Sequence, residues 1–411
     1  MNASKQGSRR KRRALIIGGS MSGLFTAAFL RQAGWDTDVY ERSTVELVGR
    51  GAGITTHPEL LEALEQSGAG LRNLGVEVEK RITLDRRGNV IAEKRLPQIL
   101  TSWDRVQSLM RQTIDPQHYH LGHSFERLEQ DGSGVVAYFS TKGRERGDLL
   151  IGADGIRSSV RAQLAPTAQP VYSGYYIWRG APDELHLDAH TRRSIFPCFT
   201  FFLPEQQQVI GYPIAGLDND LRPGHRRYNF IWYRVGDAEA LRRMCVDARG
   251  EQHAYSVPPP LIRKDLIERM RAEAEEIMPP QFLDCLRNMR PFFTPIYDFS
   301  TPQLVFGRVA LVGDAASSAR PHMGFGMAKA GGDAQAIAQA LGNYDDIDAG
   351  LAAYNRIRQP VGERIMLHGR KLGAHLGVNL QTDEERAMWR LLQDHRAMMD
   401  WIAVPNFLAA T

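Results

Sequence analysis

The sequence predicts a mixed α/β protein with a doubly wound, Rossmann-like domain, an inserted and mainly antiparallel β-sheet domain, and a C-terminal helical segment. Three observations predict this fold class. Short apolar strands followed by glycine-rich turns occur near residues 14–17, 149–152 and 309–313, and helical patterns alternate with them. The segment from about 171 to 232 carries an aromatic-rich alternating pattern. The chain from 351 onward is charged and helical in pattern.

The opening motif is a strand, a turn and a helix followed by a second strand. Residues 14–17 have the length and composition of a buried parallel strand. Gly18 permits a tight turn, and Gly23 lets the following helix pack close to the strand. Residues 37–40 form the second predicted strand, and Glu41 stands at its carboxyl end. A carboxylate there can bind ribose hydroxyls while the helix amino terminus faces a pyrophosphate, so the motif predicts an adenine dinucleotide site. A simple turn is the alternative, because Ser20 replaces the second glycine of the motif.

The remaining elements follow in order along the chain. Helical patterns cover residues 58–68, 103–114, 266–278 and 327–341, and hairpins are predicted around the turns at 86–89 and 204–207. In the strand 228–233, Tyr228, Phe230 and Trp232 should lie on one face and Asn229, Ile231 and Tyr233 on the other. We expect a basic tail at 1–12, a discontinuous cofactor-binding domain at 13–170 and 290–345, a substrate-binding domain at 171–289, and a helical region at 346–411.

Composition excludes several classes of protein. The chain has 411 residues, 43% hydrophobic and 24% charged, with a formal net charge of +4, so we expect no nucleic-acid partner. No stretch approaches the roughly 18 uninterrupted apolar residues of a membrane span, and no secretory signal is apparent. The three cysteines, Cys198, Cys245 and Cys285, lack metal-ligand spacing. We therefore expect free thiols, no metal site and a cytoplasmic location.

Two further strand-end motifs carry aspartates. Asp154 and Gly155 follow the strand at 149–151, and Asp314 follows the strand at 309–312. Ligands bind at the carboxyl ends of such strands, although each aspartate is equally consistent with a helix cap or a turn. The run from Pro321 to Gly326 precedes a helix whose amino terminus would stabilise negative charge on a reduced flavin.

Taken together, the three motifs resemble, in order and spacing, the single-component (class A) FAD-dependent aromatic hydroxylases. The resemblance extends from about residue 13 to about residue 341. Residues 175–180, 211–214 and 229–233 are most similar to the dihydroxypyridine hydroxylase branch of that family. A serine is the expected residue at the position of Ser20 in this branch, so the resemblance removes the doubt about the opening motif.

The resemblance implies an FAD site built from all three motifs. Arg105 and Gln107 fit a phosphate contact at the start of a helix only loosely, and Asp154, Gly155 and Arg157 also serve the transient nicotinamide cofactor. The implied cofactor residues are Gly18, Ser20, Met21, Ser22, Gly23, Glu41, Arg42, Arg50, Gly53, Arg105, Gln107, Asp154, Gly155, Arg157, Asp314, Pro321, Gly324, Gly326 and Met327.

The resemblance also implies a reaction. NADH or NADPH reduces the flavin, O2 adds to form a flavin C4a-hydroperoxide, and one oxygen is transferred to a small hydroxylated aromatic or N-heteroaromatic ring. Water must be excluded, and the ionised form of the ring must be favoured. His322 and Tyr212 are the candidate catalytic residues. The candidate substrate-pocket residues are Trp178, Phe201, Tyr212, Asn229, Tyr233 and His57. Core packing is the alternative role for each aromatic residue, and surface or capping positions are the alternative for His57.

Two other functions compete with hydroxylation. A flavin halogenase shares the FAD domain, but the Trp-x-Trp-x-Ile-Pro element and catalytic lysine of those enzymes are not found in the sequence. A non-catalytic FAD- or NAD-binding scaffold would not need the run from 321 to 327. We expect a monomer or a homodimer, as is common in the family.

Overall fold

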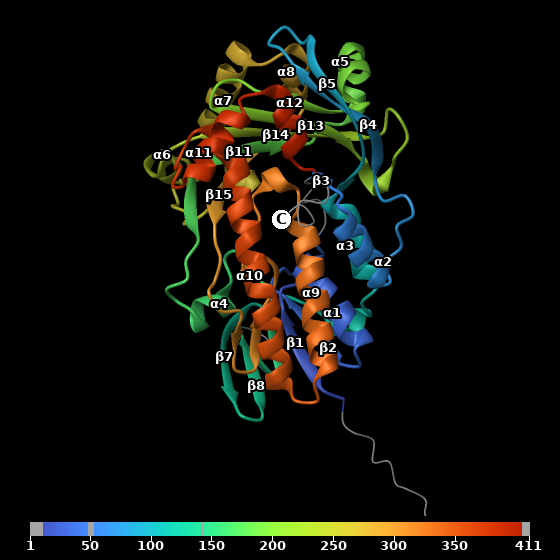
Figure 1. Cartoon of the computed structure of the whole chain (residues 1–411), viewed down its shortest axis with the longest axis vertical. Coiled ribbons are helices and arrows are strands. Elements are labelled where there is room, and N and C mark those ends of the chain that lie inside the picture. Colours follow the sequence, from blue (N-terminus) through green and yellow to red (C-terminus); the bar gives the residue numbers. More distant parts are fainter. Residues whose placement is uncertain (1–10, 48–52, 141–142, 405–411) are drawn as a thin grey trace, which may run out of the picture.

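The computed structural model describes residues 11–47, 53–140 and 143–404. Two β-sheets lie at different heights along the long axis of the molecule, one with β1 and β2 and the other with β11, β13 and β14 (Figure 1). The long helix α10 (Ile347–Gly373) runs beside α9 (Gly326–Asn343) over the lower sheet (Figure 1). The predicted fold class, a doubly wound domain with an inserted antiparallel sheet and C-terminal helices, is confirmed.

The first sheet is mainly parallel and has the strand order β16-β17-β10-β1-β2-β6. Its strands are β1 (Arg13–Ile17), β2 (Asp36–Glu41), β6 (Tyr119–Leu121), β10 (Leu149–Gly152), β16 (Val305–Phe306) and β17 (Val309–Leu311). Only the edge strand β16 is antiparallel. The central strands are buried, as continuous apolar runs predict for a sheet covered on both faces. Helix α1 (Met21–Gln32) packs against this sheet and against α9.

The second sheet has eight strands in the order β15-β11-β14-β13-β12-β4-β5-β3 and is antiparallel except for the β12–β4 pair. Its strands are β3 (Gly53–Thr55), β4 (Val76–Leu84), β5 (Val90–Ser102), β11 (Val171–Gly180), β12 (Cys198–Phe202), β13 (Gln207–Ile214), β14 (Arg227–Val235) and β15 (Phe292–Asp298). Both predicted hairpins are present. The hairpin predicted at 76–92 was expected within the unit 13–170, but its strands β4 and β5 extend the second sheet instead.

The two faces of the second sheet belong to different cores. Tyr228, Phe230 and Trp232 pack with helices α7 (Lys264–Ile277) and α8 (Pro280–Arg287). Ile231 and Tyr233 face the other way and join the core shared with the first sheet. The predicted alternation along this strand is confirmed, and it turns one face of the sheet toward the cofactor-binding lobe.

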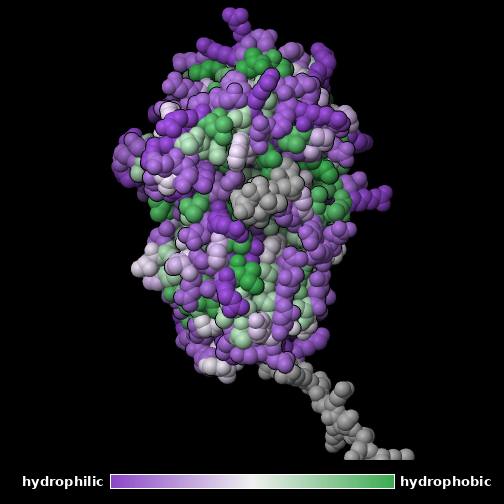
Figure 2. Space-filling view, viewed as in Figure 1, coloured by the Kyte–Doolittle hydropathy of each residue, from purple (hydrophilic) through white to green (hydrophobic). Residues whose placement is uncertain are grey.

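The other elements complete the two lobes. A third, antiparallel sheet contains β7 (Phe125–Asp131), β8 (Gly134–Phe139) and β9 (Gly143–Gly147). The remaining α-helices are α2 (Pro58–Gln66), α3 (Trp103–Gln112), α4 (Ser159–Leu164), α5 (Ala189–Ile195), α6 (Ala238–Met244), α11 (Asp383–Leu391) and α12 (His395–Trp401). None of the helices in the described part of the chain has both the length and the apolar composition needed to cross a membrane. Figure 2 shows mostly hydrophilic residues on one face, with hydrophobic residues in separated patches.

A buried arginine fastens the C-terminal segment to the second sheet. The Arg81 side chain on β4 is 0% exposed. Its guanidinium donates hydrogen bonds to the backbone oxygens of Met399, Ile402 and Ala403 at 2.9, 2.6 and 2.7 Å, and to Oε1 of Gln98. Burial lowers the pKa of Arg81 to about 9, which still leaves it charged at neutral pH. The charge is thus compensated by carbonyl dipoles, because no carboxylate of the described residues forms an ion pair with it.

We predict that Arg81→Leu lowers the free energy of unfolding by about 3–5 kcal/mol, because it leaves the buried carbonyls of Met399 and Ile402 without a donor and that of Ala403 with the Gln98 amide alone. The 399–403 segment should then become sensitive to limited proteolysis. Denaturant unfolding and mass spectrometry of the digest measure the two effects. Arg95→Leu, on the exposed side of the neighbouring strand β5, is the matched control and should change stability by less than about 0.5 kcal/mol. Equal stability of the two variants would contradict this role.

Candidate active site

A cavity of about 520 Å³ lies between the carboxyl ends of the parallel strands and the inward face of the second sheet. Most of the residues predicted to bind the cofactor line it. They are Gly18, Ser20, Met21, Ser22, Glu41, Arg42, Gly53, Asp154, Gly155, Arg157, Asp314, Pro321, Gly324, Gly326 and Met327. The three sequence motifs therefore meet at one cavity. We propose below which of these residues contact the cofactor.

The opening turn leaves the amino terminus of α1 free. Gly18 has a φ of +112°, and its N–H donates to the Tyr40 carbonyl at 2.9 Å, which joins the start of the turn to the neighbouring strand β2. Glu41 accepts hydrogen bonds from the N–H of Gly19 at 2.8 Å and of Ser43 at 2.9 Å. The Ser20 side chain makes no capping bond to the helix. The first N–H groups of α1 are thus available to an anion in the cavity.

Gly23 has a packing function beneath this turn. A Cβ atom at this position would lie 1.9 Å from the Gly18 carbonyl oxygen, so only glycine lets the helix pack this close. Gly23 does not line the cavity. Its contribution is the close approach of helix and strand that the sequence also predicted.

Asp154 combines both roles that the sequence left open. Its carboxylate accepts hydrogen bonds from Ser158 Oγ at 2.5 Å and from the N–H of Ser159 at 2.7 Å, so it caps α4. It also lines the cavity. Burial raises the pKa of its carboxyl, and the cap bonds oppose that shift. Arg157 lies beside it, over the Tyr255 ring, and its guanidinium bonds to Ser256.

Asp314 has no such structural duty. It follows β17 in the turn Gly313–Ala315 and is open to the cavity. Among the described residues, none donates a hydrogen bond to its carboxylate. The surrounding protein raises the pKa of this carboxyl by withdrawing it from bulk water. A carboxylate without a protein partner at this position is suited to accept hydrogen bonds from ligand hydroxyls.

A buried charge cluster holds the turn that carries Asp314. Gly313 has a φ of +59°, and its N–H donates to Asp333 at 2.9 Å. Lys329 Nζ bridges the Gly313 carbonyl at 2.7 Å and Asp333 at 2.8 Å. Arg358 donates to the other oxygen of Asp333 at 2.8 Å. Both backbone groups of Gly313 are therefore fixed by side chains of α9, and the position of Asp314 is fixed with them.

The second helix amino terminus at the cavity belongs to α9. No side chain caps its first turn, which begins after Phe325. Gly324 has a φ of +62°, and a Cβ atom built on Gly326 would meet no atom within 4 Å. The backbone here is consequently open to a planar ligand, as the sequence predicted for the run from 321 to 326.

The second sheet supplies an aromatic and apolar wall. Its lining residues are Gly53, Ile54, Thr55, Arg179, Phe199, Ile210, Tyr212, Ile231 and Tyr233. The hydroxyls of Tyr212 and Tyr233 have no hydrogen-bond partner among the described residues. Burial raises the pKa of both phenols. They therefore stay protonated and can donate a hydrogen bond to a ligand in the cavity.

Three of the predicted pocket residues lie elsewhere. Trp178 was predicted in the pocket, but it points to the opposite face of β11 and packs against Phe293 with ring centroids 5.5 Å apart. Phe201 lies on the inward face two residues along β12 from Phe199, where it is fully buried and does not line the cavity. Asn229 accepts a hydrogen bond from the Gly53 N–H at 2.9 Å and thereby holds β3 to the sheet. The side-chain period of two makes Arg179, not Trp178, the cavity residue.

The two predicted histidines are buried outside the cavity lining. His322 is 0% exposed, with Nδ1 2.9 Å from Gln208 Oε1 and Nε2 3.0 Å from the Tyr175 hydroxyl. Its ring stacks on Tyr233 at 4.2 Å, and burial holds its pKa well below the usual range. His57 Nε2 bonds to the Met323 carbonyl at 3.0 Å. This geometry gives neither histidine direct access to a ligand, contrary to the prediction.

Three other residues predicted to bind the cofactor are not found in the cavity lining. Arg105 donates to the Arg72 carbonyl at 2.7 Å, and neither it nor Gln107 lines the cavity. Arg50 lies outside the described residues. The sequence missed other lining residues, among them Trp103, His123, Phe125, Arg179, Phe199, Arg320 and Ala403. Tyr175 and Arg179 are four residues apart on β11, so their side chains lie on the same face of the strand. Knowing which face of β11 turns toward the cavity would therefore have identified Arg179.

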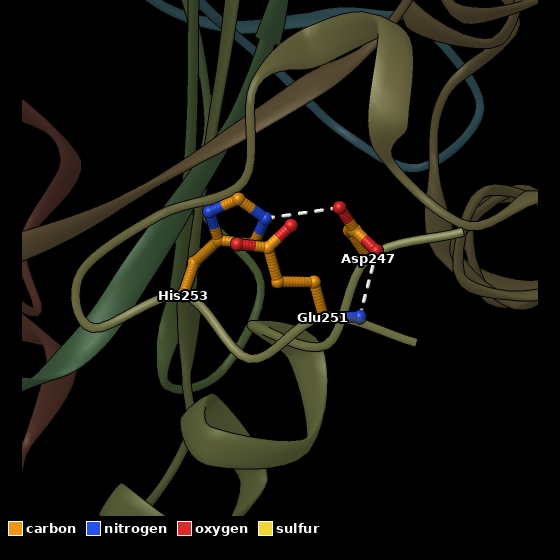
Figure 3. Close-up of side chains that lie close together, drawn as sticks. All are labelled: Asp247, Glu251 and His253. Carbon is orange, nitrogen blue, oxygen red and sulfur yellow. Dashed lines mark hydrogen bonds and ion pairs between the residues drawn. The ribbon is translucent and has the colours of Figure 1, made fainter. Parts of the chain in front are cut away.

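One group of side chains in the described residues has the geometry that could hold a metal ion, namely Asp247, Glu251 and His253 (Figure 3). Asp247 is 1% exposed, and its oxygens accept bonds from the N–H of Arg249 and Glu251 and from His253 Nε2 at 3.0 Å. These bonds close the loop and occupy the carboxylate. The three side chains therefore stabilise a turn of the chain, and none of them lines the cavity.

Comparisons with known proteins identify the family. A family model described as FAD binding domain-like matches residues 172–298. The 2,6-dihydroxypyridine 3-monooxygenase of Paenarthrobacter nicotinovorans is 33% identical over 373 residues, which cover 89% of this chain and 91% of that enzyme. The chain is a class A FAD-dependent aromatic hydroxylase.

Other comparisons agree with this assignment. The present structure is similar to the solved structure of 2,6-dihydroxypyridine-3-hydroxylase from Arthrobacter nicotinovorans, with a TM-score of 0.84 and 30% sequence identity. The match covers 92% of this chain and 96% of that one. The FAD-dependent urate hydroxylase of Klebsiella pneumoniae is 28% identical over 381 residues, covering 87% of this chain and 89% of that enzyme. Membership of this family favours the hydroxylase over the halogenase and scaffold alternatives.

The geometry of the hydroxylase fits FAD. Two uncapped helix amino termini, α1 and α9, face the same cavity and offer N–H groups to a pyrophosphate and to an electron-rich ring edge. The free carboxylate of Asp314 lies with them. The open backbone at Gly155 and Gly326, where a Cβ would meet nothing within 4 Å, leaves room for a bound cofactor.

We predict that Asp314→Ala weakens FAD binding by about 10- to 100-fold, the usual worth of hydrogen bonds to a charged group. The stability of the cofactor-free protein should not fall, because none of the described residues donates a hydrogen bond to Asp314. Asp333→Ala is the matched comparison: it should lower both FAD affinity and cofactor-free stability, since it leaves Lys329 and Arg358 buried without their carboxylate. Flavin fluorescence titration and denaturant unfolding measure the two quantities. Unchanged FAD affinity in Asp314→Ala would remove this residue from the cofactor site.

A second prediction concerns pH. Burial lowers the pKa of His57 to about 4, below the value of about 6.5 expected in the unfolded chain. The unfolded state then binds more protons between these values, so stability is complete above pH ~6.5 and falls as the pH drops toward 4. His57→Gln removes this titration and keeps an amide N–H for the Met323 carbonyl. The stability difference between wild type and variant should shrink by about 1 kcal/mol from pH 7.5 to 5.5. His186→Gln, an exposed control, should keep the wild-type pH dependence.

Proposed function

We propose that this enzyme uses NADH or NADPH and O2 to hydroxylate a small ring that already carries hydroxyl groups, with a hydroxypyridine-like N-heteroaromatic favoured over a simple phenol. One observation carries the proposal. A single cavity joins a half built from helix amino termini and Asp314 to a half walled by Tyr212, Tyr233 and apolar side chains. The relatives named after 2,6-dihydroxypyridine and urate support the preference for a heteroaromatic ring.

The two halves of the cavity divide the work. FAD bound at the strand ends supplies the redox chemistry that links the nicotinamide cofactor, O2 and the ring. Glu41, Asp314 and the first turn of α1 are the proposed contacts to its ribose, ribityl and pyrophosphate groups. Pro321, Gly324, Gly326 and Met327 are the proposed contacts to its ring. These residues bind and orient the cofactor without proton transfer of their own.

The wall of the second sheet orients the substrate and excludes water. Phe199, Ile210 and Ile231 present apolar surface to a flat ring. Tyr212 and Tyr233 keep their phenolic protons, because burial raises the pKa of each. Each can donate a hydrogen bond to a negatively charged ring oxygen and so favour the ionised, nucleophilic form of the substrate. We propose Tyr212 as a substrate contact rather than a base, and His322 as a support for Tyr233 through ring stacking.

The proposed function is tested with a substrate panel. We expect a yellow protein whose oxidation of NADH or NADPH is accelerated by 2,6-dihydroxypyridine, with more hydroxylated product than hydrogen peroxide. Phenols, salicylate and urate complete the panel and show which ring class is preferred. If no phenol or heteroaromatic ring stimulates oxidation, the substrate class is wrong even in a protein that holds FAD.

A pair of variants separates the cavity face from the opposite face. Tyr212→Phe should lower kcat/KM for the preferred ring by about 10-fold while FAD stays bound, because it removes one hydrogen bond to a charged oxygen. Tyr228→Phe is the matched control, since its hydroxyl is buried on the other face and is without a hydrogen-bond partner among the described residues. Equal activities of the two variants would show that the Tyr212 hydroxyl does not touch the substrate.

A further inference from the structure

Arg179 is the one charged side chain that the described strands of the second sheet contribute to the cavity lining. It lies on β11 and is paired in register with Ile231 of β14, which is in turn paired with Ile210 of β13. These three residues form a cross-strand row on the inward face, with Tyr233 two residues along from Ile231. Arg179 therefore stands at the β11 end of this row, next to the aromatic and apolar wall.

The guanidinium of Arg179 lacks a protein anion. Among the described residues, no carboxylate or carbonyl lies within hydrogen-bond or ion-pair distance, and its nearest recorded ring contact is Phe292 at 5.8 Å. Arg320, another arginine of the same cavity, is by contrast held by Asp298 at 2.6 Å. Burial lowers the pKa of Arg179, while the phenols of Tyr212 and Tyr233 oppose that shift. A half-buried cation beside apolar side chains, without a counterion among the described residues, is stabilised by a ligand that supplies negative charge.

The geometry of the guanidinium limits the kinds of ligand that Arg179 can bind. Its planar fork of N–H donors matches two oxygens, or one oxygen and a ring nitrogen, that lie in the plane of a flat ligand. The wall around it is suited to the faces of an aromatic ring. The cofactor's phosphates have another partner available, at the uncapped amino terminus of α1.

We propose that Arg179 binds an anionic oxygen in the plane of the substrate ring, so that the enzyme selects ring anions over neutral rings of the same shape. This inference rests on the proposed function for its ligand class. The anionic oxygen is either an ionised ring hydroxyl or a carboxylate. In the first case Arg179 also lowers the pKa of the bound substrate's hydroxyl, which is the group whose ionisation activates the ring.

The test measures binding, not turnover. The probes are two matched pairs, 2,6-dihydroxypyridine with 2,6-dimethoxypyridine and benzoate with benzamide, titrated into the FAD-loaded enzyme and followed by the change in flavin absorbance. In wild type we expect tighter binding of the charged member of at least one pair. Arg179→Gln should weaken the binding of that anion by about 10- to 100-fold and leave the neutral partner within about twofold. Arg179→Lys, which keeps the charge but not the fork, should lie between them.

The pH dependence gives a second readout. Wild-type affinity for 2,6-dihydroxypyridine should rise as the ligand ionises, and Arg179→Gln should flatten that rise. Arg234→Gln is the matched control, because Arg234 lies on the same sheet but is paired with Glu273 at 2.6 Å away from the cavity lining. It should bind both members of each pair as wild type does. The two probe pairs distinguish a ring hydroxylate from a carboxylate as the bound anion.

The outcomes separate this inference from the proposed function. Loss of charge selectivity in Arg179→Gln without any substrate-stimulated oxidation in wild type would support the anion site and reject hydroxylation of the tested rings. Normal turnover with unchanged charge selectivity in Arg179→Gln would overturn the anion site and leave the function intact. Equal weakening of charged and neutral probes, or weaker FAD binding in both Arg179 variants, would also overturn it, because Arg179 would then support the wall or the cofactor.

Discussion

The in-register pairing of parallel strands is the constraint on which the rest of the structure depends. The Ala153 N–H donates to the Ile17 carbonyl at 2.8 Å, and the Val312 N–H donates to the Gly152 carbonyl at 3.0 Å. These two bonds join the ends of β1, β10 and β17, so the turns that follow all three strands open at the same edge. Segments nearly three hundred residues apart thereby form one side of one cavity. The free carboxylate of Asp314 is useful only because this pairing puts it beside the first turn of α1.

In the second sheet, alternate residues of each strand face two different environments. Its outward residues pack under α7 and α8, and its inward residues must remain available to a ligand. Tyr212 and Tyr233 therefore keep unpartnered hydroxyls, and Arg179 keeps an unpartnered charge, at positions where a purely structural sheet would carry aliphatic residues. Groups left unsatisfied by the protein on the inward face give this wall its capacity to discriminate among rings.

Local patterns predicted much of this arrangement, and long-range geometry explains the failures. The apolar runs, glycine turns and alternation at 228–233 depend on neighbours in sequence, so the fold class and the hairpins follow from them. The fifteen predicted cofactor residues that line the cavity were implied by the family resemblance of the motifs that follow these strands. Trp178 was placed on the wrong face because the parity of β11 relative to the cavity depends on how the sheet docks. His322 was misjudged because its partners, Gln208 and Tyr175, lie 114 and 147 residues away. The union of β4 with β12 is likewise invisible to any local signal.

The contact between Arg81 and the segment 399–403 has a consequence for biosynthesis. Arg81 emerges from the ribosome 318 to 322 residues before the carbonyls that satisfy it. Until β12 (Cys198–Phe202) is made, β4 also lacks its parallel neighbour, and the Arg81 charge then stays without its carbonyl partners until the 399–403 segment follows. Ala403, which lines the cavity, arrives with the same segment. The nascent chain therefore leaves the Arg81 charge without these carbonyls, and the chamber without Ala403, until this late segment arrives.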